Sequence, residues 1–272
     1  MSKFFIIGIF SALGFVGMTN AQAQKNTEIK IYAAGSLRSA LTEIAQYYEA
    51  TNPTVKINFA FGASGLLRDR LLAGEISDIF ASANMDHPEK ISNAGKSESV
   101  IRFTSNKLCV LANPNFNLAG KTLVERMMDK EIKLGISTPK ADPSGDYAFE
   151  MFEKIDSKGL GPKGVSDVLK TKALQLTGGP QSPQPPANKN VYGDLVATGQ
   201  ADIFITYCTN AKIAIKENPA QKALEIPDAY NITSNYGMVV FNNASQSARD
   251  FYKFITSPKA QEIFIDQGFA KL

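Results

Sequence analysis

The chain has 272 residues, of which 44% are hydrophobic and 20% are charged, a composition typical of a soluble globular protein with one large or two ordinary domains. The formal net charge of +3 is small, and the lysines and arginines form no long run. These features argue against a nucleic-acid-binding protein, because such proteins cluster their basic residues.

The first 23 residues have the pattern of an export signal. Lys3 supplies a short positive segment, residues 4–18 are mostly apolar, and Ala21-Gln22-Ala23 has the small-x-small pattern of a cleavage site. A membrane anchor is the alternative, but the apolar run is short for a bilayer span. We therefore expect a signal peptide over residues 1–23 and a mature chain that begins at Gln24.

After residue 24, strand-like and helix-like segments alternate, which indicates an α/β fold with largely parallel sheets. Strands are expected at 28–32, 55–59, 78–81, 107–111, 133–136, 202–207 and 236–241. Helices are expected to begin near residues 36, 64, 88, 144 and 191, and two more lie around 251–255 and 261–265.

The turn after the first expected strand carries small residues and a serine. Ala33, Ala34 and Gly35 would let a ligand approach the backbone, and Ser36 stands where a helix N-cap is expected. A helix start presents unpaired backbone N–H groups and the positive end of the helix dipole. The turn is therefore either one wall of an anion-binding cleft or an ordinary capped helix start.

Three later helix starts share this character, at Ser64, Ser144 and Val191. Two of the four starts lie in each half of the chain, and each follows a strand or loop, where ligands bind in open α/β folds. If they face one another, their neutral donors could surround a small, fully ionised oxyanion. A ligand that keeps a proton would require an acceptor in the site.

Two segments far apart in the chain resemble each other. Residues 72–80 and 195–204 both end a helix at glycine and continue into Asp-Ile-Phe. Similarity of this kind suits two similar α/β lobes, although coincidence is the alternative. The proline-rich segment 178–186 is expected to be extended and exposed, either as a stiff loop at a cleft rim or as a plain linker.

Residues for common catalytic and metal sites are scarce. A serine triad needs a histidine, and the chain has only His87, in an apparent helix start. Cys109 and Cys208 with His87 form a weak set of metal ligands, and the two cysteines are either a disulfide or two buried thiols. We expect no enzyme, no cofactor and no metal held by the protein itself.

From about Lys30 to its end, the chain resembles the periplasmic molybdate-binding proteins of ABC importers. The matching motifs are Ala-Ala-Gly-Ser-Leu at 33–37, Phe-Gly-Ala-Ser-Gly at 61–65, Asp-Ile-Phe-Ala-Ser-Ala at 78–83, Asp-Pro-Ser-Gly-Asp-Tyr at 142–147, Ile-Thr-Tyr at 205–207 and the segment 257–264.

This resemblance implies a two-lobe periplasmic binding protein of type II. Each lobe would be a mixed sheet flanked by helices, with the ligand cleft between the lobes and crossover strands joining them. Lobe 1 would comprise residues 24–106 and 232–272, and lobe 2 residues 107–231. The resemblance also implies a periplasmic monomer that closes on its ligand and docks on ABC permease subunits, without nucleic acid.

The resemblance also implies the ligand set for molybdate or tungstate. Ser36 and Ser64 would donate through their hydroxyls, Ser144 and Val191 through their backbone N–H groups, and Tyr207 through its phenol. Asp142 and Asp146 flank Ser144, and a carboxylate near a dianion is repulsive. Either these carboxylates are caps, or the ligand is another oxyanion or a small metal complex. A signalling receptor of the same fold and an exported enzyme are the remaining alternatives.

Overall fold

The computed structural model of the chain describes Met1, residues 27–183 and residues 189–272. Apart from Met1, the predicted signal peptide over residues 1–23 lies outside the described residues, as do residues 24–26 and residues 184–188, which include the end of the proline-rich segment. No helix among the described residues is long and apolar enough to span a bilayer.

The described strands form one continuous path in the order β2-β1-β3-β9-β4-β7-β5-β6, and β8 pairs with β4. Their bounds are β1 Thr27–Ala34, β2 Val55–Gly62, β3 Ile79–Ser82, β4 Ile101–Ala112, β5 Leu134–Ser137, β6 Leu174–Thr177, β7 Ile203–Tyr207, β8 Lys222–Glu225 and β9 Thr233–Val240. In the first lobe β1 runs parallel to β2 and β3, and β9 runs antiparallel to β3 and β4. In the second lobe β5 runs parallel to β6 and β7.

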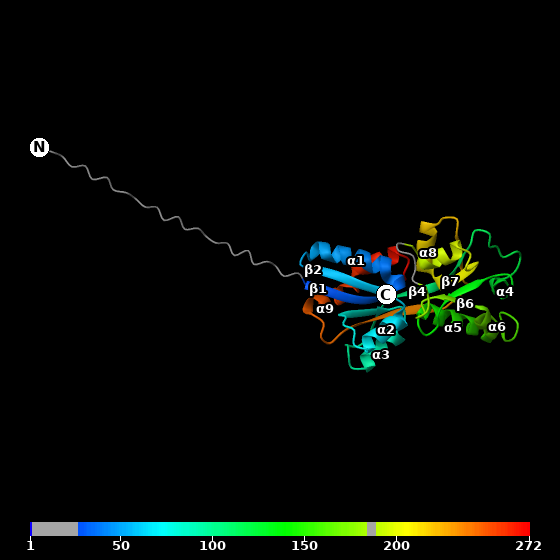
Figure 1. The fold of residues 1–272 in the computed structure, drawn as a ribbon, viewed down its shortest axis with the longest axis horizontal. Helices are drawn as coiled ribbons and strands as arrows, with labels where there is room; N and C mark the ends of the chain where they lie inside the picture. The colour runs from blue at the N-terminus through cyan, green and yellow to red at the C-terminus, as the bar shows by residue number, and fades with distance from the viewer. Residues whose placement is uncertain (2–26, 184–188) are drawn as a thin grey trace.

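Two long strands, β4 and β9, join the lobes. β4 pairs with β9 from Ile101 to Lys107 and with β7 from Leu108 to Ala112, so one strand belongs to both sheets. Figure 1 shows the result as two α/β bodies side by side, with β4 passing between them. The fold is therefore the predicted two-lobe α/β arrangement. The exact lobe boundaries at 106/107 and 231/232 stay a prediction.

Ten helices of the described residues cover the two sheets. They are α1 Arg38–Thr51, α2 Ser64–Leu72, α3 Asp86–Asn93, α4 Leu123–Met128, α5 Pro143–Ser157, α6 Val165–Lys172, α7 Val191–Ala197, α8 Cys208–Glu217, α9 Gln246–Phe254 and α10 Pro258–Asp266, and a short 3₁₀ helix, η1, spans Gly35–Leu37. In the first lobe, α1, α9 and α10 bury Leu41, Phe251 and Phe264 on one face of the sheet. α2 and α3 bury Leu71 and Ile91 on the other face.

The resemblance between the two Asp-Ile-Phe segments is structural. In the first lobe the Lys30 N–H donates to Asp78 Oδ2 at 2.8 Å, and the Asp78 N–H donates back to the Lys30 carbonyl at 2.8 Å. In the second lobe Lys133 and Asp202 make the same pair of hydrogen bonds, at 2.8 and 2.9 Å. Each aspartate thus fixes the start of a strand to the neighbouring parallel strand, and both lobes use the same device.

Two local predictions are wrong. Ser36 is not a helix N-cap, because Gly35–Leu37 forms η1 and the cap of α1 falls on Leu37, whose side chain accepts no hydrogen bond. The described part of the proline-rich segment is not simply extended. The Ser182 N–H donates to the Gly179 carbonyl at 3.1 Å, and the Ser182 hydroxyl accepts from the Gly179 N–H, which closes a turn.

Candidate functional site

The two predicted residues of the first lobe lie at one edge of its sheet. Ser36 follows β1 and Ser64 follows β2, and these parallel strands are paired up to Ala34 and Gly62. Both turns therefore emerge side by side at the carboxyl edge of the sheet, where open α/β folds bind ligands. Both serine side chains are buried.

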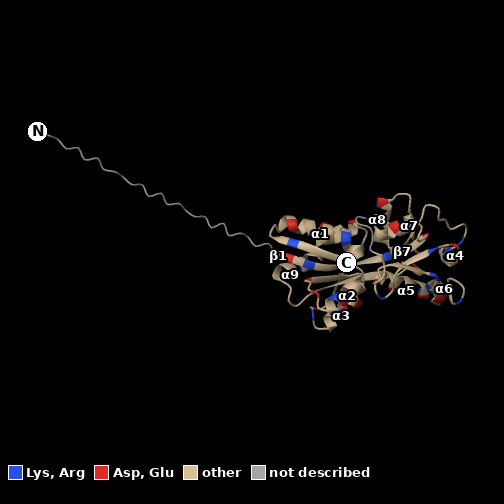
Figure 2. Ribbon diagram, viewed as in Figure 1, with Lys and Arg blue, Asp and Glu red and all other residues tan. Residues whose placement is uncertain are grey.

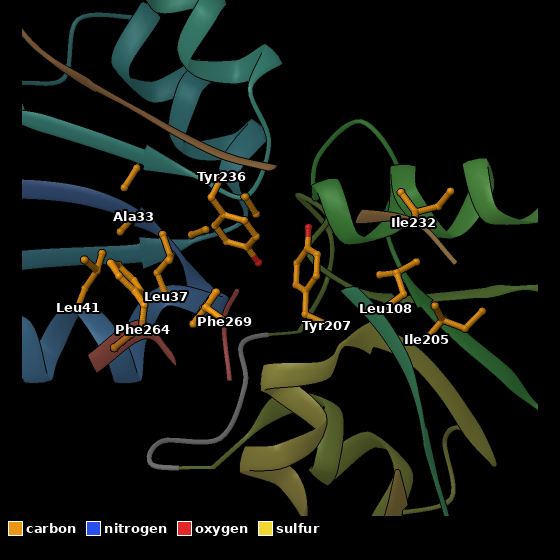
Figure 3. Close-up of a cluster of buried hydrophobic side chains, with 14 of the residues drawn as sticks. Ala33, Leu37, Leu41, Leu108, Ile205, Tyr207, Ile232, Tyr236, Phe264 and Phe269 are labelled. Atoms are coloured by element: carbon orange, nitrogen blue, oxygen red, sulfur yellow. The ribbon is translucent and has the colours of Figure 1, made fainter. Parts of the chain in front are cut away.

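Tyr236 connects the two lobes at this edge. Its hydroxyl lies 2.9 Å from the Ser36 Oγ, and its ring lies 5.6 Å from the Tyr207 ring, measured between centroids. Figure 3 shows the two rings facing each other, Tyr236 from the first lobe and Tyr207 from the second. Sequence reasoning missed Tyr236. Its strand pattern predicts only a core residue, and its partner Ser36 lies 200 positions away.

Ser64 keeps a donor available. Its Oγ accepts a hydrogen bond from the Ala83 N–H at 3.1 Å, so the hydroxyl proton can point elsewhere. The neighbouring Gly65 makes a contact between the lobes, because its N–H donates to the Ala141 carbonyl at 2.8 Å. A Cβ at Gly65 would lie 2.6 Å from the carbonyl oxygens of both Lys140 and Ala141. Only glycine allows the lobes to approach this closely.

Ser144 lies in the first turn of α5, directly after Asp142 and Pro143. Asp142 is the N-cap, and its Oδ1 accepts from the Ser144 N–H at 3.0 Å, while Pro143 occupies the first turn. Asp146 Oδ1 accepts from the Lys140 N–H at 2.7 Å. Both aspartates therefore bind backbone N–H groups. The Ser144 hydroxyl is fully buried and has no hydrogen-bond partner among the described residues.

Tyr207 is the last residue of β7 and has a buried side chain, 1% exposed. Its hydroxyl has no hydrogen-bond partner within the described part of the chain. Burial raises the pKa of this hydroxyl well above its usual value, and nearby Tyr236 and Asp142 raise it further. The group is therefore a neutral donor. The next residue, Cys208, forms a disulfide with Cys109 on β4, which settles the open question about the two cysteines.

Val191 is the first residue of α7 and is half-buried. Asn190 caps this helix, and its Oδ1 accepts from the Gly193 N–H at 2.9 Å. Burial raises the pKa of the adjacent Tyr192 hydroxyl, and the Asp142 carboxylate raises it too. The Tyr192 hydroxyl therefore lies close enough to Asp142 to be affected by its charge. Among the described residues, no hydrogen bond or aromatic contact links Val191 to the other four predicted residues in the way that Tyr236 links Ser36 to Tyr207.

The acidic residues beside Ser144 form no ion pair with any described residue. Lysines and arginines are dispersed over both lobes in Figure 2, and none of the ion pairs among the described residues includes Asp142 or Asp146. Burial raises the pKa of the Asp142 carboxyl to about 6, and Asp146 adds to this effect. The five predicted site residues are thus uncharged, whereas Asp142 and Asp146 beside Ser144 and Arg38 near Ser36 carry charges.

A protein-bound metal finds no support in the described residues. They contain no group of three histidine, cysteine or acidic side chains arranged to hold an ion. Both cysteines are in the disulfide. His87 lies 2.8 Å from Arg68 through its Nδ1, and burial together with the Arg68 cation lowers its pKa to about 4.

The family model described as bacterial extracellular solute-binding protein matches residues 29–270. An uncharacterised protein of Pasteurella multocida is 33% identical over 246 residues, which cover 89% of this chain and 98% of that protein. The molybdate-binding protein ModA of Mycobacterium tuberculosis is 28% identical over 247 residues, which cover 89% of this chain and 84% of the relative.

Solved structures agree with this fold. The periplasmic molybdate-binding protein of Azotobacter vinelandii superposes with a TM-score of 0.69 at 19% identity, covering 90% of this chain and 99% of that one. The sulfate-binding protein SubI of Mycobacterium tuberculosis superposes with a TM-score of 0.74 at 14% identity, covering 91% and 88%. At these identities the solved structures support only the fold. The family model covers nearly the whole described chain and supports the family. The chain belongs to the family of bacterial extracellular solute-binding proteins.

Proposed function

We propose that this solute-binding protein serves an ABC importer and binds a tetrahedral oxyanion, molybdate or tungstate, in the cleft between its lobes. The observation that carries the proposal is a pair of buried hydroxyls, on Ser144 and Tyr207, that have no hydrogen-bond partner among the described residues. They come from different elements of the second lobe, and Tyr207 faces the first lobe through Tyr236.

Buried hydroxyls of this kind are expensive unless something accepts from them. Leaving a buried donor unpaired costs about 1–3 kcal/mol, whereas a hydrogen bond to a charged group contributes about 1.5–3 kcal/mol. An oxyanion offers acceptors only, so neutral O–H and N–H groups match it without a competing cation. These donors would therefore bind most tightly a ligand with several negatively charged oxygens and no proton donor.

The remaining donors of the proposed site come from both lobes. Ser36 and Ser64 supply hydroxyls from the first lobe, and Val191 supplies the N–H at the start of α7. For Ser144 we assign the hydroxyl as the main donor, because its N–H donates to Asp142. The ModA relatives bind molybdate by name, and this supports the choice of oxyanion.

Delivery of the ligand follows from the two-lobe architecture. The lobes meet at the hydrogen bond from Gly65 to Ala141 and are joined through β4 and β9. Opening about these strands would break that contact and expose the donors to solvent. We propose that residues 1–23 direct export to the periplasm and are removed, and that the mature protein acts as a monomer. It closes on the anion and releases it at a membrane permease.

A thermal-shift panel tests the ligand. The mature chain is heated with molybdate, tungstate, sulfate or phosphate, each at several concentrations. A ligand at one hundred times its Kd stabilises the native state by about 2.7 kcal/mol, which corresponds to a Tm increase of roughly 5–10 °C for a chain of this size. Molybdate and tungstate should produce this shift. A Tm that none of the four anions moves at millimolar concentration contradicts the proposal, and a shift with sulfate alone reassigns the ligand.

A further inference from the structure

Asp142 is an acid at the N-cap of α5, where its carboxyl accepts a hydrogen bond from the Ser144 N–H. From its position we infer that Asp142 takes up a proton when a dianion binds, so that oxyanion binding is coupled to one proton. This inference rests on the proposed function and adds a pH dependence and a residue that sets it.

The Asp142 carboxyl is held in place at the site. Its Oδ1 accepts from the Ser144 N–H at 3.0 Å, so it occupies the helix start beside the unpaired Ser144 hydroxyl. On its other side a Cβ at Gly178 would lie 2.6 Å from Asp142 Oδ2, so the backbone after β6 packs directly on the carboxyl. The preceding Ala141 accepts the hydrogen bond that closes the lobes. The carboxyl cannot swing freely into solvent when the cleft is closed.

The groups that face Asp142 do not neutralise it. From its own helix comes Asp146, whose charge opposes ionisation of Asp142. From α7 and β7 come the hydroxyls of Tyr192 and Tyr207, whose pKa values are raised chiefly by burial and also by the Asp142 charge. From β5 comes the Ser137 hydroxyl, which favours the carboxylate, as the Ser144 N–H does.

No cation of the described residues pairs directly with the Asp142 carboxylate. No lysine, arginine or histidine among the described residues forms an ion pair with Asp142. The nearest basic residue along the chain, Lys140, has an exposed side chain and directs its N–H to Asp146. With the lobes in contact, as they are in this structure, burial raises the pKa of Asp142 to about 6. A bound dianion is a further like charge, and it disfavours the carboxylate again.

The sign of the pH dependence follows from this comparison. The pKa of Asp142 is higher in the complex than in the free protein, so binding takes up a proton and affinity falls as pH rises above about 6. If the pKa in the complex exceeds the assay range, the Kd rises nearly tenfold per pH unit, or roughly 50-fold between pH 6 and pH 8. An oxyanion that binds in its monoprotonated form would carry one proton into the complex in place of the one on Asp142.

Calorimetry measures the proton directly. The mature chain is titrated with molybdate at pH 6, 7 and 8, each in two buffers of different ionisation enthalpy. We expect uptake of about half a proton at pH 6 and about 0.9 at pH 7. Molybdate binding without proton uptake, and with a Kd constant from pH 6 to pH 8, overturns the inference but leaves the proposed function intact. No binding of molybdate or tungstate contradicts the proposed function and this inference together.

Two variants separate Asp142 from other acids. Asp142→Asn keeps an oxygen to accept from the Ser144 N–H but cannot titrate, so its proton uptake should vanish and its Kd at pH 8 should be lower than that of the wild type. Asp156→Asn is the matched control, because Asp156 also accepts from a backbone N–H, that of Gly164 at 3.1 Å. It should leave the uptake unchanged. Uptake that persists in Asp142→Asn overturns the assignment, and the wild-type titration stands even if that variant fails to fold.

Discussion

Removing the Tyr207 hydroxyl should change ligand affinity and protein stability in opposite directions. In Tyr207→Phe the ring, and with it the contact to Tyr236 at 5.6 Å, is retained. The lost group is a donor to the proposed anion. A hydrogen bond to a charged partner contributes about 1.5–3 kcal/mol, so the Kd for molybdate should rise roughly 10- to 150-fold.

The ligand-free protein should respond in the other direction. The Tyr207 hydroxyl is 1% exposed and unpaired among the described residues, and such a group destabilises the native state by about 1–3 kcal/mol. Its removal should therefore raise the Tm of the ligand-free protein by about 2–4 °C for each kcal/mol recovered. An ordinary core tyrosine with a bonded hydroxyl would show the reverse.

The assay combines calorimetric titration with thermal unfolding of wild type and variant. Tyr252→Phe is the matched control, because the buried Tyr252 hydroxyl has a partner and donates to the Met238 carbonyl at 3.3 Å. It should lose about 1 kcal/mol of stability and keep its affinity. If Tyr207→Phe binds molybdate like the wild type, or is less stable without ligand, the role given to this hydroxyl is wrong.

Three further predictions follow from the same geometry. The double variant Ser36→Ala with Ser64→Ala should weaken molybdate binding by more than ~100-fold in calorimetry, since it removes two donors to a charged ligand. Its circular dichroism should match that of the wild type. Unchanged affinity would refute the first-lobe assignment. Gly65→Ala should weaken binding by roughly 1–3 kcal/mol in calorimetry, because its Cβ meets two backbone carbonyls of the second lobe at 2.6 Å. Tight binding by this variant would show that closure does not need the contact. Replacing Cys109 and Cys208 by serine opens a loop with a sequence separation of 99 residues. In the chain-entropy model this should lower the free energy of unfolding, measured in urea, by about 4–5 kcal/mol. A loss below about 1 kcal/mol would argue against a stabilising disulfide.

The architecture was predictable because its signals are local. β1 and β2 each end in a turn with small residues and continue into a helix that buries apolar side chains, and this alternation is visible in a single sequence. The Asp-Ile-Phe segments at 78–80 and 202–204 carry the same hydrogen bonds in each lobe, so even a weak repeat reported a real structural one. In each lobe these hydrogen bonds join two neighbouring parallel strands, so a similar local sequence makes the same contacts in both lobes.

The errors at the site arise where geometry depends on distant residues. Ser36 looks like an N-cap, but the 3₁₀ turn Gly35–Leu37 shifts the helix start and frees its hydroxyl for Tyr236, 200 residues away. The sequence flagged Asp142 as a repulsive neighbour and could not show that it binds the Ser144 N–H. The disulfide was one of two open alternatives, because pairing needs Cα atoms within about 7 Å, and only the structure brings them to 4.8 Å.

The central claim is that neutral donors from both lobes converge on one oxyanion. Anomalous X-ray scattering from crystals grown with tungstate tests it most directly, because the metal itself is located. The proposed site predicts one strong peak between the lobes, with its oxygens in hydrogen-bond contact with the hydroxyls of Ser36, Ser64, Ser144 and Tyr207. A peak elsewhere on the protein, or a tungstate held by the residues of one lobe alone, would contradict it.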